Sequence, residues 1–118
     1  MSIEAELLAE PGVLAVGKFA YRGDRFLYKG RLSEDQARWL SIICRATSMS
    51  TTMQGRMLAA LHPETRIEPL RGWMLAGDEH TLLVITNVFC LLDSRRATAA
   101  AVLARLRTAL ADEPMDLM

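Results

Sequence analysis

One long segment, residues 33–61, limits what this chain can fold into more than any other part of the sequence. Ser33 is followed three residues later by Gln36, with Glu34 and Asp35 between them. This is the capping box that begins many helices, and acidic residues in a first turn suit the helix dipole. His62-Pro63 follows Leu61, and proline cannot continue a helix. The sequence therefore predicts one helix of roughly eight turns.

Apolar residues on this predicted helix form two stripes at helical spacing. The first stripe holds Leu40, Ile43, Cys44, Thr47, Leu58 and Leu61, the second holds Ile42, Met49, Met53 and Ala60, and Arg38, Arg45 and Arg56 share a third, polar side. A helix on the surface of a monomer needs only one apolar stripe. We therefore expect the first stripe to face a sheet and the second to face another chain.

The middle of the helix is rich in residues with low helix propensity, namely Thr47, Ser48, Ser50, Thr51 and Thr52. Their hydroxyls can bond to the carbonyl four residues earlier. Two interpretations are open. Small side chains here can let another backbone approach closely, or the helix can bend or break at this point.

The rest of the chain predicts strands and two shorter helices. A helix capped by Ser2 runs to Glu10, and one capped by Asp93 or Ser94 runs to Ala111. Strands are expected at 13–21, 26–30, 65–76 (interrupted by Pro69, hence at an edge or bulge), 81–85 and 88–92, with turns at 22–25, 77–80 and Thr86-Asn87, and residues 112–118 are expected to be loose. The expected fold class is α/β in the α+β sense. It has a single five-stranded antiparallel sheet flanked by helices, in the order α-β-β-α-β-β-β-α, as one domain over residues 1–118.

Composition and charge narrow the classes of function. The chain has 14 Lys+Arg and 14 Asp+Glu, so no basic excess indicates a nucleic-acid partner. The longest apolar run, Thr81 to Leu92, is too short to span a bilayer, and the acidic start MSIEAELLAE lacks the basic, apolar character of a signal peptide. Cys44 and Cys90 lie among apolar residues and are expected to be reduced and buried. These features predict a cytoplasmic protein that binds neither nucleic acid nor membrane.

Four segments together resemble the roadblock/LC7 family, which has a profilin-like fold. They are LLAEPGVLAVGKF, the YKGRLSEDQA entry to the long helix, PLRGWMLAGDEHT and VITNVF. The chain looks most like a bacterial, functionally uncharacterised branch of that family. The resemblance implies homo- or heterodimers in which the two sheets join edge to edge and the long helices lie together on one face. It also implies scaffolding or regulatory work, often with small GTPases as partners. No site motif of this branch can be carried over to residues here.

Candidate interface residues follow from the pattern. The second stripe and the small residues beside it, Ile42, Met49, Thr52 and Met53, are the expected homodimer interface. Partner-binding candidates form two pairs. Arg71 and Trp73 are expected on the same side of a strand, unless Trp73 is core and Arg71 is solvated. Arg95 and Arg96 are expected at the start of the last helix, where they oppose its dipole, unless they are simply solvated.

An enzyme is not expected. The two histidines, His62 and His80, are too few for a converging metal site, and neither cysteine has a neighbouring base. No phosphate-binding glycine motif occurs, so we expect no catalytic residue, cofactor or metal. The predicted function is a non-enzymatic dimeric scaffold or regulatory protein that acts on a partner such as a small GTPase. The alternative is a module that binds a small molecule or senses redox or sulfur species, near Trp73 or a cysteine.

Overall fold

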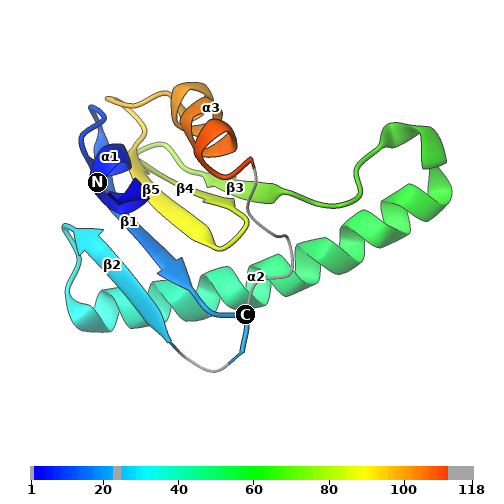
Figure 1. Ribbon diagram of the computed structural model, residues 1–118, viewed down its shortest axis with the longest axis horizontal. Coiled ribbons are helices and arrows are strands. Elements are labelled where there is room, and N and C mark those ends of the chain that lie inside the picture. Colours follow the sequence, from blue (N-terminus) through cyan, green and yellow to red (C-terminus); the bar gives the residue numbers. More distant parts are fainter. Residues whose placement is uncertain (1, 23–24, 112–118) are drawn as a thin grey trace.

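The computed structural model describes residues 2–22 and 25–111, and their elements follow the predicted order α-β-β-α-β-β-β-α (Figure 1). The helices are α1 (Ile3–Leu8), α2 (Glu34–Leu61) and α3 (Ala99–Ala109), with a short 3-10 turn, η1 (Pro63–Thr65). The strands are β1 (Val13–Phe19), β2 (Phe26–Gly30), β3 (Gly72–Ala76), β4 (His80–Ile85) and β5 (Val88–Asp93). They form one antiparallel sheet in the order β2-β1-β5-β4-β3, which confirms the predicted fold class.

The sheet lies between two helical layers, with α1 and α3 on one face and α2 on the other (Figure 1). Alternate residues of a strand point to opposite faces, so each face has its own core. On the α1/α3 face, strand residues such as Leu83 and Cys90 pack with Leu7 of α1 and Leu106 of α3. The core on the α2 face is smaller and is formed by Phe19, Cys44, Leu82, Val84 and Phe89.

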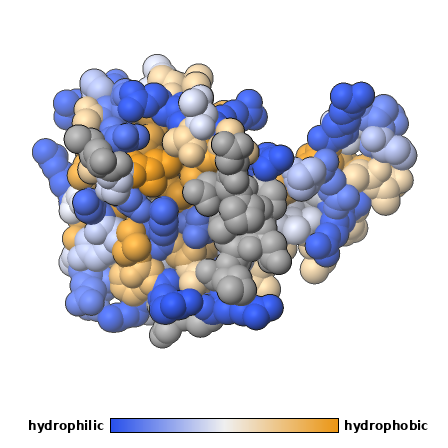
Figure 2. All heavy atoms as spheres, viewed as in Figure 1, coloured by the Kyte–Doolittle hydropathy of each residue, from blue (hydrophilic) through white to orange (hydrophobic). Residues whose placement is uncertain are grey.

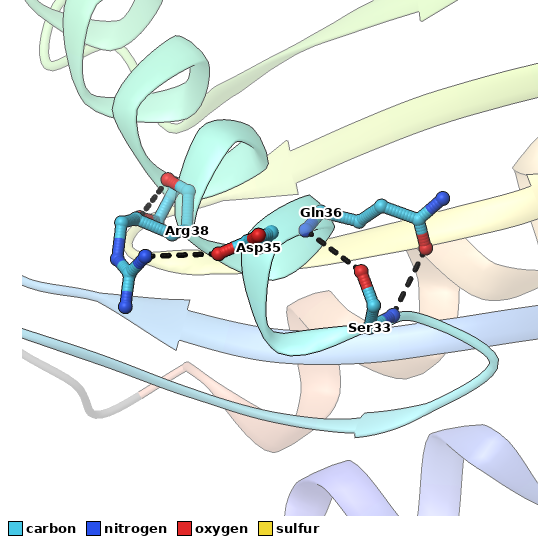
Figure 3. Close-up of polar contacts among 5 residues, drawn as sticks. Ser33, Asp35, Gln36 and Arg38 are labelled. Carbon is cyan, nitrogen blue, oxygen red and sulfur yellow. Dashed lines mark hydrogen bonds and ion pairs between the residues drawn. The ribbon is translucent and has the colours of Figure 1, made fainter.

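The start of α2 is fixed by the predicted capping box (Figure 3). The Gln36 backbone N–H donates to Ser33 Oγ at 3.1 Å, and the Ser33 N–H donates to Gln36 Oε1 at 2.9 Å. Arg38 pairs with Asp35 at 3.0 Å in the same turn. These contacts satisfy N–H groups that have no partner inside the helix.

The serine- and threonine-rich middle of α2 is helical, so the helix is continuous from Glu34 to Leu61 and does not break there. Thr51 Oγ1 donates to the Thr47 carbonyl at 2.9 Å, and Thr52 Oγ1 donates to the Ser48 carbonyl at 2.7 Å. The side of α2 that is buried carries small residues, which are Ala37, Ser41, Cys44, Ser48 and Gly55. These small side chains let α2 lie close to the sheet, and Ser48 is the one residue of the serine- and threonine-rich segment among them.

The last turns of α2 extend past the sheet and form an arm with η1 and the segment that returns to β3 (Figure 1). Two contacts fasten the returning segment to the helix. Leu70 packs against the helix at Gly55, where a Cβ would lie 3.7 Å from Leu70 Cβ. Arg56 and Glu68 form an ion pair at 3.8 Å.

Two element boundaries differ from the sequence prediction by more than two residues. The expected strand over 65–76 is wrong for its first part, because residues 66–71 are irregular and strand pairing begins at Gly72. The chain must first return along the arm, where no strand lies beside it. The last helix is capped by Thr98, whose side chain accepts from the Ala101 N–H at 3.3 Å. Asp93 is not the cap because it pairs with His80 in the sheet and accepts from the Arg95 N–H.

The other boundaries agree to within two residues or lie partly outside the described residues. Ser2 caps α1, and Thr86-Asn87 forms the tight turn between β4 and β5, whose last pair is Ile85 with Val88. Residues 23–24 of the predicted 22–25 turn, and the predicted loose segment 112–118, lie outside the described residues. Within residues 2–22 and 25–111, no helix is both long and apolar enough to cross a bilayer.

Candidate functional site

The outward side of α2 carries a row of large apolar side chains that the domain itself leaves uncovered. Trp39 is 66% exposed, Met53 64%, Met57 62% and Leu61 73%. Ile43 belongs to the same row, and Met49 lies at its flank; both are exposed. We call Trp39, Ile43, Ala46, Ser50, Met53, Met57 and Leu61 the outward stripe of α2, because residues three and four apart share one side of a helix.

The position of the stripe follows from what α2 buries against the sheet. The sequence predicted that Ile43, Leu58 and Leu61 face the sheet, and this is wrong, since all three are exposed. The buried side is instead centred on Cys44 and Ser48. Gly55 is the last buried residue of α2, and the last turns of the helix project from the body of the domain (Figure 1 and Figure 2), so large apolar residues there have no strand beneath them.

The predicted interface residues occupy different positions around this stripe. Met53 lies within it, and Met49 lies beside it. Ile42 is half-buried, and Thr52 is exposed but its hydroxyl is bonded to the Ser48 carbonyl. Sequence reasoning missed Trp39 and Met57. The repeat of alternating four- and three-residue spacings from Trp39 to Met57 was the signal that could have identified them.

Arg71 and Trp73 both line a groove beside α3, and Trp73 also packs against the core under α2. Arg71 precedes β3, and its side chain lines a groove beside α3. Trp73 packs at the edge of the core under α2, and its Nε1–H donates to Ser48 Oγ at 2.7 Å. Trp73 therefore fits the structural alternative, in which it belongs to the core.

Arg95 and Arg96 lie in the turn before α3 and not in its first turn. Arg95 pairs with Glu79 at 3.0 Å, and both side chains are exposed. An exposed pair of this kind contributes little to stability. The expected opposition to the helix dipole is absent because α3 begins only at Ala99.

The cysteines and histidines do not form a reactive site in the described ranges. Cys44 and Cys90 are both fully buried and lie in the cores of opposite faces. Burial raises the pKa of each thiol to about 12, which disfavours the reactive thiolate. His62 is exposed beside Glu64, and His80 is exposed at the start of β4. Among residues 2–22 and 25–111, no three His, Cys, Asp or Glu residues lie close enough to hold a metal ion.

A groove on the α3 side of the sheet is the hollow that includes Arg71. It has a volume of about 560 Å³ and lies between the returning segment, β3 and α3. Its apolar lining includes Met74, Leu83, Ile85 and Leu103. We call it the β3–α3 groove.

With this geometry established, comparison with known proteins identifies the class of fold. The chain is similar to the crystal structure of a Roadblock/LC7 domain from Streptomyces avermitilis, with a TM-score of 0.60 and 14% sequence identity. The match covers 92% of this chain and 94% of that one, so the fold is a Roadblock/LC7 fold. No curated protein sequence gives a significant match. The chain belongs to the family described as "Uncharacterized conserved protein (DUF2173)", whose model matches residues 4–108.

Proposed function

We propose that this protein is a non-enzymatic scaffold or regulatory protein that acts as a homodimer through the outward stripe of α2. The exposure of Trp39, Met53, Met57 and Leu61 in one row carries the proposal. Contiguous apolar surface of this kind marks interaction sites on folded proteins. Burial stabilises by roughly 25 cal/mol per Å² of apolar surface, so a row along a helix ~42 Å long is a substantial driving force.

The sizes of the stripe residues favour an antiparallel pair of α2 helices. Large side chains stand at both ends of the stripe, and Ala46 and Ser50 stand in the middle. Ser50 is midway between Trp39 and Leu61, and also midway between Ile43 and Met57. A two-fold axis at Ser50 would therefore place large residues of one chain against large residues of the other, and small residues would allow close approach at the crossing.

The arm of α2 supports the same arrangement. The first half of α2 lies on its own sheet, whereas the last turns extend past it (Figure 1). In an antiparallel pair, the arm of each chain would lie along the supported half of the other α2. The apolar residues Met57 and Leu61, which have no cover in one chain, would then be covered by Trp39 and Ile43 of the second copy.

The finer parts of this proposal concern partners and location. The fold resemblance supports a protein partner such as a small GTPase, and Arg96, exposed in the turn before α3, remains a candidate contact. We place the protein in the cytoplasm. Two buried, unpaired thiols on opposite faces of the sheet fit a reducing compartment better than an oxidising one.

Solution mass by light scattering tests the dimer. The wild type is expected at twice the chain mass of 13.1 kDa. The double variant Met49→Glu/Met53→Glu should be a folded monomer, because charged side chains cannot be buried unpaired in the interface. Ala104→Glu, an exposed position on α3 across the sheet, is the matched control and should remain dimeric. A wild type that is monomeric at tens of micromolar would overturn the proposal.

The alternative function, a small-molecule or redox/sulfur-sensing module, has one supporting observation. The β3–α3 groove is large enough for a ligand and includes Trp73 in its lining. A sensing role for the thiols has no such support, since both are buried and their pKa is raised. Native mass spectrometry of the purified protein separates the two functions, because a ligand-binding module would carry or take up a small molecule without a change of subunit number.

A further inference from the structure

The β3–α3 groove is bordered by three arginines, Arg66, Arg71 and Arg107, and by no carboxylate among the described residues. A smaller cavity of about 340 Å³ lies next to it and shares Arg71, Ile85 and Arg107 with it. The smaller cavity also has no Asp or Glu in its lining. The two neighbouring hollows are therefore lined by three arginines and by apolar side chains, with no Asp or Glu among the described residues.

None of these three arginines has an ion pair or side-chain hydrogen bond to another described residue. By contrast, Arg38, Arg56, Arg95 and Arg105 each pair with a carboxylate. Arg107 lies in the last turn of α3, where a cation suits the helix dipole. Arg66 and Arg71 lie in the irregular segment before β3, so no helix dipole stabilises their positive charge. The positive charge of the groove is thus not balanced within the described structure.

The distribution of charge indicates the kind of occupant. Arg66 lines only the larger cavity, whereas Arg71 and Arg107 line both, so arginines border each of the two hollows. A fatty acid has a single carboxylate, which cannot pair with all three arginines. An extended peptide can place successive carboxylates at several arginines and set apolar side chains on Met74, Leu83 and Leu103.

We propose that the β3–α3 groove is a docking site for an extended peptide segment of a partner protein in which carboxylate and apolar side chains alternate. This docking site rests on the proposed scaffold function, because it specifies the chemistry of a partner that the scaffold would bind. It does not require that the protein be a dimer. The groove is on the α3 face of the sheet, and it shares no residue with the outward stripe of α2. Peptide binding in the groove and dimerisation through the outward stripe therefore use separate surfaces.

Fluorescence anisotropy with a labelled peptide tests the site on the full chain. The probe is the heptapeptide Asp-Glu-Pro-Met-Asp-Leu-Met, which has the required chemistry and is also the sequence of residues 112–118. The expected result is saturable binding that weakens at least tenfold in Arg71→Gln/Arg107→Gln. Arg38→Gln is the matched control, because it removes one exposed arginine from α2, and it should bind as the wild type does. Equal losses in the control would overturn the proposal.

A second peptide, Asn-Gln-Pro-Met-Asn-Leu-Met, removes the carboxylates and keeps the apolar side chains. Its binding should be at least tenfold weaker, and equal binding of the two peptides would refute recognition of charge. Displacement of the probe by decanoate but not by the unlabelled acidic peptide would assign the groove to a single-headed amphiphile and overturn the proposal.

Two protein variants separate the remaining explanations. In Asp112→Asn/Glu113→Gln/Asp116→Asn, the acidic residues of the chain's own last segment are neutralised. If the probe bound to this variant but not to the wild type, the chain's own last segment would be the occupant of the groove. That result would overturn the proposal of a partner peptide. Binding that persists in Met49→Glu/Met53→Glu supports the docking site even if the dimer proposal fails. Loss of binding there, with the fold intact, contradicts the separation of the two surfaces.

Discussion

The indole of Trp73 donates a hydrogen bond to the hydroxyl of Ser48 at 2.7 Å, and this bond joins the edge of the sheet to the middle of α2. The two residues are 25 positions apart, and the arm lies between them in the sequence. Ser48 is buried, and Tyr21, whose pKa is raised chiefly by burial, lies in the same core. A polar side chain in the middle of the helix is therefore part of the core on this face.

Replacing Ser48 with alanine should destabilise the protein by about 1–3 kcal/mol, because the indole N–H would lose its acceptor in a partly buried site. Urea unfolding followed by circular dichroism measures the change. Ser50→Ala, two residues along and exposed, is the control and should change the free energy of unfolding by less than about 0.5 kcal/mol. Equal effects of the two substitutions would show that the Trp73 bond is not what stabilises this region.

Two glycines should respond to alanine in opposite ways. Gly55→Ala should stabilise by about 0.5–1 kcal/mol, since alanine favours a helix and its Cβ would meet Leu70 only at ordinary contact distance, 3.7 Å. In Gly17→Ala, the Cβ would lie 2.3 Å from Phe89 Cζ and 2.5 Å from the Leu27 carbonyl, so we expect a loss of about 1–3 kcal/mol or more. Thermal unfolding of the two variants gives the comparison, and a destabilised Gly55→Ala would contradict the packing described for the arm.

The thiols predict both a reactivity and a pH dependence. Because the pKa of Cys44 and Cys90 is about 12 in the folded protein, Ellman's reagent at pH 8 should react with neither until denaturant is added. The folded state holds these protons more tightly than the unfolded state, in which the thiols have their ordinary pKa of 9.0. Their contribution to stability is therefore complete below pH 9 and is lost as pH rises from 9 toward 12.

Stability measured in Cys44→Ala/Cys90→Ala provides the reference for this effect. The slope of unfolding free energy between pH 9 and 11 should be shallower in that variant than in the wild type. Prompt labelling of a thiol in the native wild type at pH 8 would be incompatible with the burial of these residues.

The antiparallel α2 pair predicts which single cysteine can form a disulfide across the dimer. Ser50→Cys lies at the proposed two-fold axis and should give a disulfide-linked dimer under mild oxidation, seen on a non-reducing gel. The two copies of Met57→Cys would be ~21 Å apart along the helix axis and should not cross-link. Cross-linking by both variants would indicate parallel helices. The native cysteines should not interfere, since both are buried.

The order of the elements was predictable because it depends on local signals. The Ser33 and Gln36 capping box, the proline after His62 and the two-residue turn at Thr86 each determine structure within a few residues. The strand over 65–76 was mispredicted because nothing local shows that the chain is still returning along an arm at residues 66–71. The same is true of Asp93, which has the chemistry of a helix cap but is already committed to pairing with His80.

The candidate surfaces were only partly predictable for a related reason. A helical pattern shows which residues share a side, but not how near the helix lies to the sheet. The small side chains of Cys44 and Ser48 let α2 lie close to the sheet. The buried side of the helix is therefore not the side with the largest side chains, and Ile43 and Leu61 point away from the sheet. The β3–α3 groove depends on Arg66 and Arg71 of the returning segment together with Arg107 of α3, which is distant in the sequence and lines the same groove only after the arm folds back.

The arm divides α2 into two parts that should unfold separately. Amide hydrogens in the first half of α2 should exchange only when the whole domain unfolds, because the sheet supports that half. The last turns are held by little more than Leu70 and the Arg56–Glu68 pair, so they form a second, weaker cooperative unit within the same helix. If a second copy covers the outward stripe, exchange in these turns will slow as protein concentration rises. The order of the arm then depends on how much of the protein is assembled.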